Sequence, residues 1–251
     1  MNIMKKKIPD RIFKYMPLSQ YTIQALATRQ LFFCALEKLN DPFEGRINFD
    51  INRKDLEKLV ESGKDSKTIT VENAKILLSL PDSDFKVLSH RLPKTIRSKI
   101  AVCCFSEEQN HVLMFAHYGN LTGICLEFDT NMNKDFRNLV AVNYEPTRKK
   151  IPFTFLTIKQ TAYIGAQKDE IWRYEHEWRL LRMGEEPVPF DFSSLVSVTF
   201  GLNTKMEDKA TVMRLLRGLN VNFFDCTAGH GKKWKLGRRK VRIPKKFLRD
   251  Q

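Results

Sequence analysis

The chain has 251 residues, of which 42% are hydrophobic and 18 are phenylalanines, so it can bury one substantial core and is not of the disordered class. No apolar run approaches the roughly 18 residues of a membrane span, and Lys5, Lys6 and Lys7 precede polar residues instead of the apolar segment of a signal peptide. We therefore expect a cytoplasmic protein without a membrane partner. The five cysteines lack Cys-x-x-Cys spacing, which predicts reduced core thiols and no zinc site.

The first hundred residues predict two strands, one helix and a helical insert. Strands are expected over residues 12–15 and 31–35, and the helix between them is capped by Ser19 and ends near residue 29. From residue 53 to 99 the chain is rich in charge, and apolar residues recur at helical spacing up to Pro81. This segment separates the second strand from the third.

The rest of the chain alternates strands with helices. Strand patterns occur over residues 101–105, 123–128, 139–144, 195–200 and 221–226. Helical patterns occur over residues 114–118, 157–172 and 206–219, with Lys168 on the solvent side of the second. No glycine-rich dinucleotide or phosphate loop is present. The pattern predicts an α+β fold with mixed sheets, as one domain over residues 1–231 that contains the helical insert 53–99, followed by a basic extension over 232–251.

Positive charge is concentrated in that extension. The formal net charge is +14, and residues 232–249 carry ten basic and no acidic side chains. Such a cluster predicts a polyanionic partner, nucleic acid first, and Trp234 can stack on a base. The predicted contacts are Lys232, Lys233, Trp234, Lys235, Arg238, Arg239, Lys240 and Arg242. The alternative is a solvated tail, although apolar residues such as Leu236 and Val241 are not needed for that purpose.

The run Trp-Arg-Tyr-Glu-His-Glu-Trp-Arg over residues 172–179 is the most informative stretch. If it is extended, the strand period of two places Glu175, Glu177 and Arg179 on one side and Trp178 on the other. A charged row between large aromatic rings is typical of a cleft. The alternative is an ordinary solvated ion pair at a strand edge.

Five further motifs accompany this run in a particular order. They are Phe13-Lys14-Tyr15, Asn40-Asp41-Pro42-Phe43-Glu44, Cys103-Cys104-Phe105-Ser106, Ala116-His117-Tyr118 and Gly123-Ile124-Cys125-Leu126. Between about residue 12 and residue 201 the chain resembles the bacterial domain-of-unknown-function family two-nine-seven-one, from which it departs at Cys34 and Phe115. That family name carries no activity, but the pattern is distantly similar to ADP-ribosyltransferases. Those enzymes hold NAD between two sheets and place a late glutamate under the nicotinamide ribose.

The similarity to ADP-ribosyltransferases implies roles for several residues. Glu177 would stabilise the oxocarbenium-like state, and Glu175 would orient or deprotonate the acceptor. Arg179 would hold Glu177 or pair with the diphosphate, and Tyr118 or His117 would contact the nicotinamide. The residues expected to bind the remainder of NAD are Lys14, Tyr15, Asn40, Asp41 and Ser106.

Other interpretations of the same residues remain. Asp41 and Glu44 can instead close a turn, with Phe43 as its hydrophobic plug. Alternatively, Asp41, Glu44, Glu175 and Glu177 can hold Mg²⁺ in a metal-dependent nuclease, or the chain can be a non-catalytic nucleic-acid-binding protein. The expected function is an NAD-dependent ADP-ribosyltransferase-like enzyme acting on or near nucleic acid, without a resident metal. A role as a bacterial defence or toxin effector is consistent with such chemistry.

Overall fold

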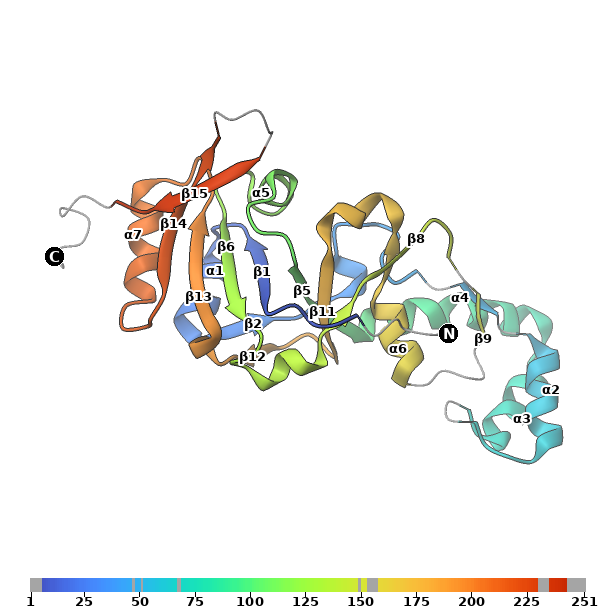
Figure 1. Ribbon diagram of the computed structural model, residues 1–251. Coiled ribbons are helices and arrows are strands. Elements are labelled where there is room, and N and C mark those ends of the chain that lie inside the picture. The colour runs from blue at the N-terminus through green and yellow to red at the C-terminus, as the bar shows by residue number, and fades with distance from the viewer. Residues whose placement is uncertain are drawn as a thin grey trace.

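The computed structural model describes residues 6–46, 48–50, 52–66, 69–148, 150–152, 158–229 and 235–242. Strands from both ends of the chain form one mixed sheet, which helices cover, and a group of helices lies to one side (Figure 1). The α+β fold expected from the sequence is confirmed.

The main sheet has nine strands in the order β15-β14-β13-β6-β1-β5-β11-β7, and β3 also pairs with β5. Most neighbours are antiparallel, and β13 and β14 are parallel. The strands are β1 (Arg11–Met16), β3 (Cys34–Ala35), β5 (Ile100–Ser106), β6 (Ile124–Asp129), β7 (Val140–Ala141), β11 (Glu177–Met183), β13 (Leu195–Phe200), β14 (Asn222–Ala228) and β15 (Leu236–Lys240).

Three two-stranded pairings complete the β-structure. They are β2 (Gln30–Phe32) with β12 (Pro187–Pro189), β4 (Asn48–Asp50) with β9 (Lys150–Pro152), and β8 (Asn143–Glu145) with β10 (Gln167–Asp169). Short 3-10 helices connect several elements, namely η1 (Leu36–Lys38), η2 (Lys134–Asn138), η4 (Glu170–Glu175) and η5 (Phe192–Ser194).

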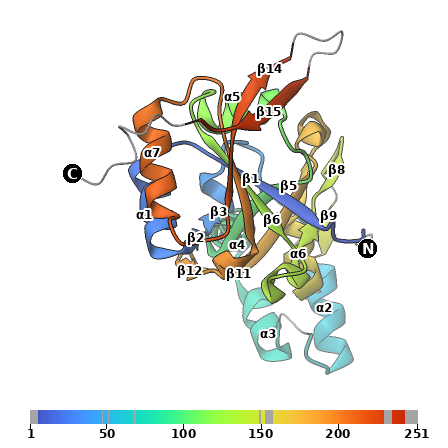
Figure 2. The ribbon, with the colours of Figure 1, turned by 60° about the vertical axis from the view of Figure 1, so that its left-hand side comes forward.

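Alternate residues of the central strands face two different cores, as the strand period requires. Ile12 of β1 joins the larger core, to which α1 (Gln20–Thr28) contributes Leu26 and α7 (Met206–Leu215) contributes Val212. Phe13 belongs to a second cluster with Phe115 of α5 (Val112–Gly119). Figure 2 shows α1 and α7 together on one side of the sheet.

The predicted helical insert contains α2 (Arg53–Ser62), α3 (Val71–Ser79) and α4 (Asp82–Lys99). Asn52 and Thr70 cap the first two, because their side chains accept hydrogen bonds from the N–H groups three residues later. These helices have a small core of their own around Leu56 and Ala74. Figure 1 shows α2 and α3 at the end of the molecule opposite β14 and β15.

The helix expected over residues 157–172 is shorter than predicted. The observed helix is α6 (Ile158–Gly165), and after it the chain forms β10 and then η4. At Gly165 the chain passes so close to β11 that an added Cβ would lie 2.0 Å from Leu181 Cδ2. The expectation that Lys168 faces solvent is therefore wrong, since on β10 this side chain is buried.

Two predicted strands are each divided between different partners. Residues 31–35 split at Phe33, because β2 pairs with β12 and β3 pairs with β5. Residues 139–144 split at Val142, whose N–H donates to Glu177, whereas the next N–H donates to Ala166. Each split brings two parts of the chain to the region that holds the predicted site residues.

Candidate functional site

The main sheet opens between β1 and β5. The register of the two strands pairs only Phe13 with Ser106, and β3 pairs with the other end of β5 at Ala101 and Val102. Within the described chain, residues 103–105 thus have no register partner on this side, and Lys14 Nζ donates instead to the Cys104 carbonyl at 3.2 Å. A backbone group that a neighbouring strand would normally satisfy is paired with an ammonium group.

A cavity of about 690 Å³ occupies this opening. Its volume is in the range of small-molecule sites, which are mostly apolar with a few convergent polar groups. Apolar and aromatic walls come from α1, β1, β5 and α5, and the polar end is formed by Tyr118, Lys168, Glu175, Glu177 and Arg179. The cavity therefore joins an apolar space to a charged wall.

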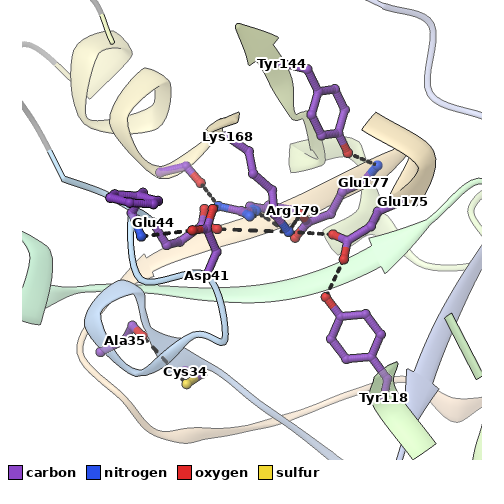
Figure 3. A network of polar contacts seen from close by, with 12 residues as sticks. Cys34, Ala35, Asp41, Glu44, Tyr118, Tyr144, Lys168, Glu175, Glu177 and Arg179 are labelled. Atoms are coloured by element: carbon purple, nitrogen blue, oxygen red, sulfur yellow. Dashed lines mark hydrogen bonds and ion pairs between the residues drawn. The ribbon is translucent and has the colours of Figure 1, made fainter. Parts of the chain in front are cut away.

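Arg179 lies at the centre of that wall (Figure 3). Its side chain is 0% exposed, and each of the three guanidinium nitrogens donates a hydrogen bond. Nε and Nη2 donate to the two oxygens of Glu177 at 2.8 Å each, and Nη1 donates to Gly165 O at 2.8 Å and to Glu44 Oε1. The bidentate geometry fixes the Glu177 carboxylate in one orientation.

Lys168 joins the two carboxylates of the Glu-x-Glu pair. Its Nζ donates to Glu175 Oε2 at 2.5 Å and to Glu177 Oε2 at 3.1 Å, and lies 4.0 Å from Glu44 Oε2. The ammonium also lies 4.9 Å from the ring centre of Trp172. Tyr118 donates to the other oxygen of Glu175 at 2.7 Å. Four separate elements thus contribute to one buried ionic network.

Backbone contacts hold Glu175 and Glu177 in place. Ser106 Oγ donates to the Glu175 carbonyl at 2.6 Å, and Tyr144 Oη accepts from the Glu177 N–H at 2.8 Å. Between them His176 adopts the left-handed conformation, with φ 43° and ψ 51°, which ends η4 and begins β11. Glu175 is therefore not on the strand, so the expected strand period does not align it with Glu177 and Arg179, and the two carboxylates meet through Lys168.

The Asn-Asp-Pro-Phe-Glu-Gly loop brings Glu44 to Arg179. Asp41 Oδ1 accepts from the Phe43 N–H at 2.9 Å, so Asp41 closes the turn in the way its position before proline suggested. Gly45 follows with φ +60°, where an added Cβ would lie 2.7 Å from Leu36 Cδ1. The expected hydrophobic plug is wrong, because Phe43 is 55% exposed.

The surroundings shift the pKa values of Glu175 and Glu177 in opposite directions. Burial raises the pKa of Glu175 above its ordinary value, against the opposing effect of Lys168. Burial acts in the same sense on Glu177, but Arg179 and Lys168 outweigh it and lower the pKa of Glu177 far below its ordinary value. Burial also raises the pKa of Tyr118, so its hydroxyl remains a donor. Neighbouring carboxylates with separated pKa values are suited to different chemical roles.

The structure brings most of the predicted NAD-site residues to this cavity. Those that line it are Lys14, Tyr15, Asn40, Tyr118, Glu175, Glu177 and Arg179. Asp41 and Ser106 are buried behind it and serve the turn and the Glu175 backbone. His117 does not line it; its exposed ring lies near Trp172 and Tyr174.

Two charged residues of the network were not among the predicted NAD contacts. The helical pattern predicts Lys168 on the outside of a helix, and the sequence indicates Glu44 only as a turn residue or metal ligand. The sequence gives one weak indication for Glu44. It lies directly before Gly45, in the motif that also contains the predicted site residues Asn40 and Asp41. Nothing in the local pattern indicates Lys168, because its burial depends on where α6 ends.

The carboxylates are paired mainly with cations of the protein itself. Across the described ranges, no three His, Cys, Asp or Glu residues are grouped so as to hold a metal ion. Asp41 Oδ2 and Glu44 Oε2 are the two buried oxygens of this region without a hydrogen-bond partner in the described chain. The arrangement differs from the four-carboxylate Mg²⁺ site considered from the sequence.

Part of the basic C-terminal segment belongs to the main sheet. β15 pairs with β14, and Leu236 is buried. Arg238 donates to Glu127 at 2.9 Å and lies 4.3 Å from the Phe224 ring centre, whereas Lys235, Arg239, Lys240 and Arg242 are exposed. The predicted contacts Lys232, Lys233 and Trp234 lie outside the described residues.

One family model matches part of the chain. Residues 114–180 match the family described as Protein of unknown function (DUF2971), in agreement with the resemblance carried by the motifs. The matched segment includes Tyr118, Lys168, Glu175, Glu177 and Arg179, and so most of the charged wall. No match was found among curated proteins or among solved structures, and none of these comparisons supports a relation to ADP-ribosyltransferases. Among the described residues, no helix has the length and apolar character required to cross a membrane.

Proposed function

We propose that the cavity between β1 and β5 binds NAD and that the chain transfers its ADP-ribosyl group to an acceptor. The observation that carries this proposal is a pair of carboxylates held in fixed orientation on the wall of an apolar space. Glu175 and Glu177 line the cavity, and their oxygens accept hydrogen bonds from Lys168, Arg179 and Tyr118. Such a site favours a ligand on which positive charge is present or develops.

The lining residues fit the nicotinamide-ribose half of NAD. The nicotinamide ring is cationic and aromatic, which suits apolar walls next to an acidic surface, and ribose hydroxyls can donate to carboxylate oxygens. Of the described cationic residues that line the cavity, Lys14 is the one outside the Glu175–Glu177 network, and its ammonium has donors left for a phosphate oxygen. The fit is therefore closest at the sugar and the ring, and Lys14 marks the direction of the diphosphate.

The two carboxylates would divide the chemistry. Glu177 stays ionised beside Arg179, so it stabilises the positive charge that develops on the ribose as nicotinamide leaves with the bonding electron pair. Glu175, whose pKa is raised, accepts the proton that the attacking acceptor loses. Tyr118 orients Glu175 through its hydrogen bond, and Arg179 acts on Glu177 by positioning it.

For the acceptor, we propose a nucleic acid or a molecule bound to one, because the exposed basic residues of β15 and its flanks offer a surface for a phosphate backbone. A function in bacterial defence or as a toxin is compatible with modification of such a target.

The proposed function is tested by nicotinamide release from NAD. Glu177→Gln is expected to lower turnover by about 100-fold or more, equivalent to roughly 2.7 kcal/mol of transition-state stabilisation. Glu127→Gln is the matched control, since Glu127 is also buried on the main sheet but pairs with Arg238 and does not line the cavity. Its turnover should remain within a few-fold of wild type.

Two results would overturn the proposal. One is the absence of nicotinamide release by wild-type protein supplied with nucleic-acid and protein acceptors. The other is full turnover by a Glu177→Gln variant whose unfolding midpoint shows that it is folded. If that variant does not fold, Glu175→Gln takes its place: loss of the proton acceptor should lower transfer to an acceptor, and full transfer by this variant would overturn the proposal equally.

A further inference from the structure

A second cavity lies on another side of Lys168. Its volume is about 620 Å³, and it is lined by the loop after the Asn-Asp-Pro turn, the loop after β8, α6 and β10. Lys168 lines both cavities, so the ammonium that holds Glu175 and Glu177 also forms part of this wall. A ligand here would lie beside the proposed catalytic carboxylates without occupying the NAD cavity.

Two arginines from distant parts of the chain converge on one aromatic ring in this cavity. The guanidinium carbons of Arg46 and Arg148 lie 5.7 Å and 5.8 Å from the ring centre of Phe43. Phe43 is 55% exposed, and both guanidinium groups pack against its ring. Contacts of this kind hold a guanidinium by its face and leave its N–H groups free to donate at the edge.

We propose that the second cavity binds a phosphate group, with Arg46 and Arg148 as its donors. Both side chains are exposed, and within the described chain neither forms an ion pair with a carboxylate. Two planar donor groups on one ring match the oxygens of a phosphate, and guanidinium groups bind phosphate in a bidentate manner. The inference rests on the proposed function in one respect: it takes the ligand of the second cavity to be the acceptor of the ADP-ribosyl group, which carries the phosphate.

The cavity wall also carries two acidic residues, Glu145 and Asp169, beside the cations Arg46, Arg148 and Lys168. Glu145 Oε1 accepts from Asn143 Nδ2 at 2.6 Å, and Asp169 Oδ1 accepts from the Ile171 N–H at 3.0 Å. Both carboxylates are thus engaged in local hydrogen bonds, and Asp169 caps η4. The phosphate can come from a free nucleotide or from a nucleic-acid chain, because the donor chemistry is the same for both.

The test is a binding titration of the full chain with three probes: adenosine 5′-monophosphate, adenosine, and a short single-stranded oligonucleotide. The double substitution Arg46→Gln with Arg148→Gln is expected to lower the affinity for the phosphate-bearing probe at least tenfold. The matched control is Arg137→Gln with Arg214→Gln, which changes charge equally on η2 and α7, where both side chains are exposed. For the oligonucleotide, loss of two contacts should lower the log–log salt slope by about 1.4.

The probes distinguish the source of the phosphate. If the double substitution weakens binding of the monophosphate, the source of the phosphate is a free nucleotide. If it weakens binding of the oligonucleotide alone, the source is a nucleic-acid chain. The inference is wrong if adenosine binds as tightly as its monophosphate and the oligonucleotide is unaffected by the double substitution, or if the control pair has the same effect as Arg46 and Arg148. Nicotinamide release measured on the same proteins separates the two proposals. If the wild-type protein releases no nicotinamide but the double substitution still weakens phosphate binding, only the proposed function is refuted.

Discussion

Replacing Lys168 by methionine should destabilise the protein strongly, because its ammonium pairs with Glu44, Glu175 and Glu177 at once. The substitution keeps the length of the side chain but leaves Glu175, Glu177 and Glu44 with Arg179 as their only cation. Removal of one partner from a buried ionic group costs about 3–5 kcal/mol because the remaining charge is unpaired in a medium of low polarity. For a chain of this size we expect the unfolding midpoint to fall by roughly 6–20 °C.

A surface pair provides a control with nearly the same geometry. Lys38 and Glu185 are also 2.5 Å apart, but their side chains are 60% and 23% exposed, compared with 2% and 1% for Lys168 and Glu175. Lys38→Met should leave the unfolding midpoint close to that of wild type, because solvent screens an exposed pair. Adding Glu175→Gln to Lys168→Met removes one acid together with one base and should restore most of the lost stability.

The loss should also depend on pH in a defined direction. Without Lys168, only the Tyr118 hydrogen bond opposes the effect of burial on Glu175, so the pKa of Glu175 in the folded state rises further above the unfolded value. A raised folded pKa contributes stability at low pH that is lost as pH rises through it. Denaturant titrations should therefore show a smaller deficit near pH 5 than near pH 8. Equal midpoints for the Lys168→Met and Lys38→Met variants would refute the reasoning.

Two further substitutions test the hydroxyl and the basic strand. Tyr118→Phe removes the 2.7 Å hydrogen bond to Glu175 and should cost about 1–2 kcal/mol in a denaturant titration. Because that bond lowers the pKa of Glu175, its loss should move the pH profile of nicotinamide release to higher pH, and an unchanged profile would contradict the role of Glu175 as a base. Replacing Arg239, Lys240 and Arg242 by glutamine should lower the salt slope of duplex DNA binding by up to about 2.7, whereas the same change at Lys54, Lys58 and Lys64 should not. Substitution is preferable to truncation here because β15 pairs with β14.

The elements that the sequence predicted well are those whose burial has a simple period. β1, β5, β6 and β13 alternate between two cores or are buried on both faces, and their apolar runs end at turn residues. Ser19 starts α1 as predicted because its side chain can satisfy the N–H of Thr22 within the same turn. These signals are local, so one sequence contains them in full.

The candidate site was only partly predictable, for the opposite reason. Glu175, Glu177 and Arg179 share one short motif, and strand spacing predicted the convergence of Glu177 and Arg179, which both lie on β11. The burial of Lys168 depends instead on where α6 ends and β10 begins, and at that point Gly165 lies too close to Leu181 to carry a Cβ. Similarly, the exposed ring of Phe43 is explained by arginines at positions 46 and 148, of which only one is near it in the chain.

The location of the ionic network argues that it was not selected for stability. Well-packed apolar residues of similar volume often stabilise a core as much as a buried ion pair or more. Here three carboxylates and two cations are gathered at the one place where the main sheet opens, and Lys168 connects the walls of both cavities described above. A network needed only to hold strands together would have no reason to face a cavity. Under the proposed function its charges are kept in fixed orientation for a ligand, at a cost in stability that the Lys168→Met and Glu175→Gln pair measures directly.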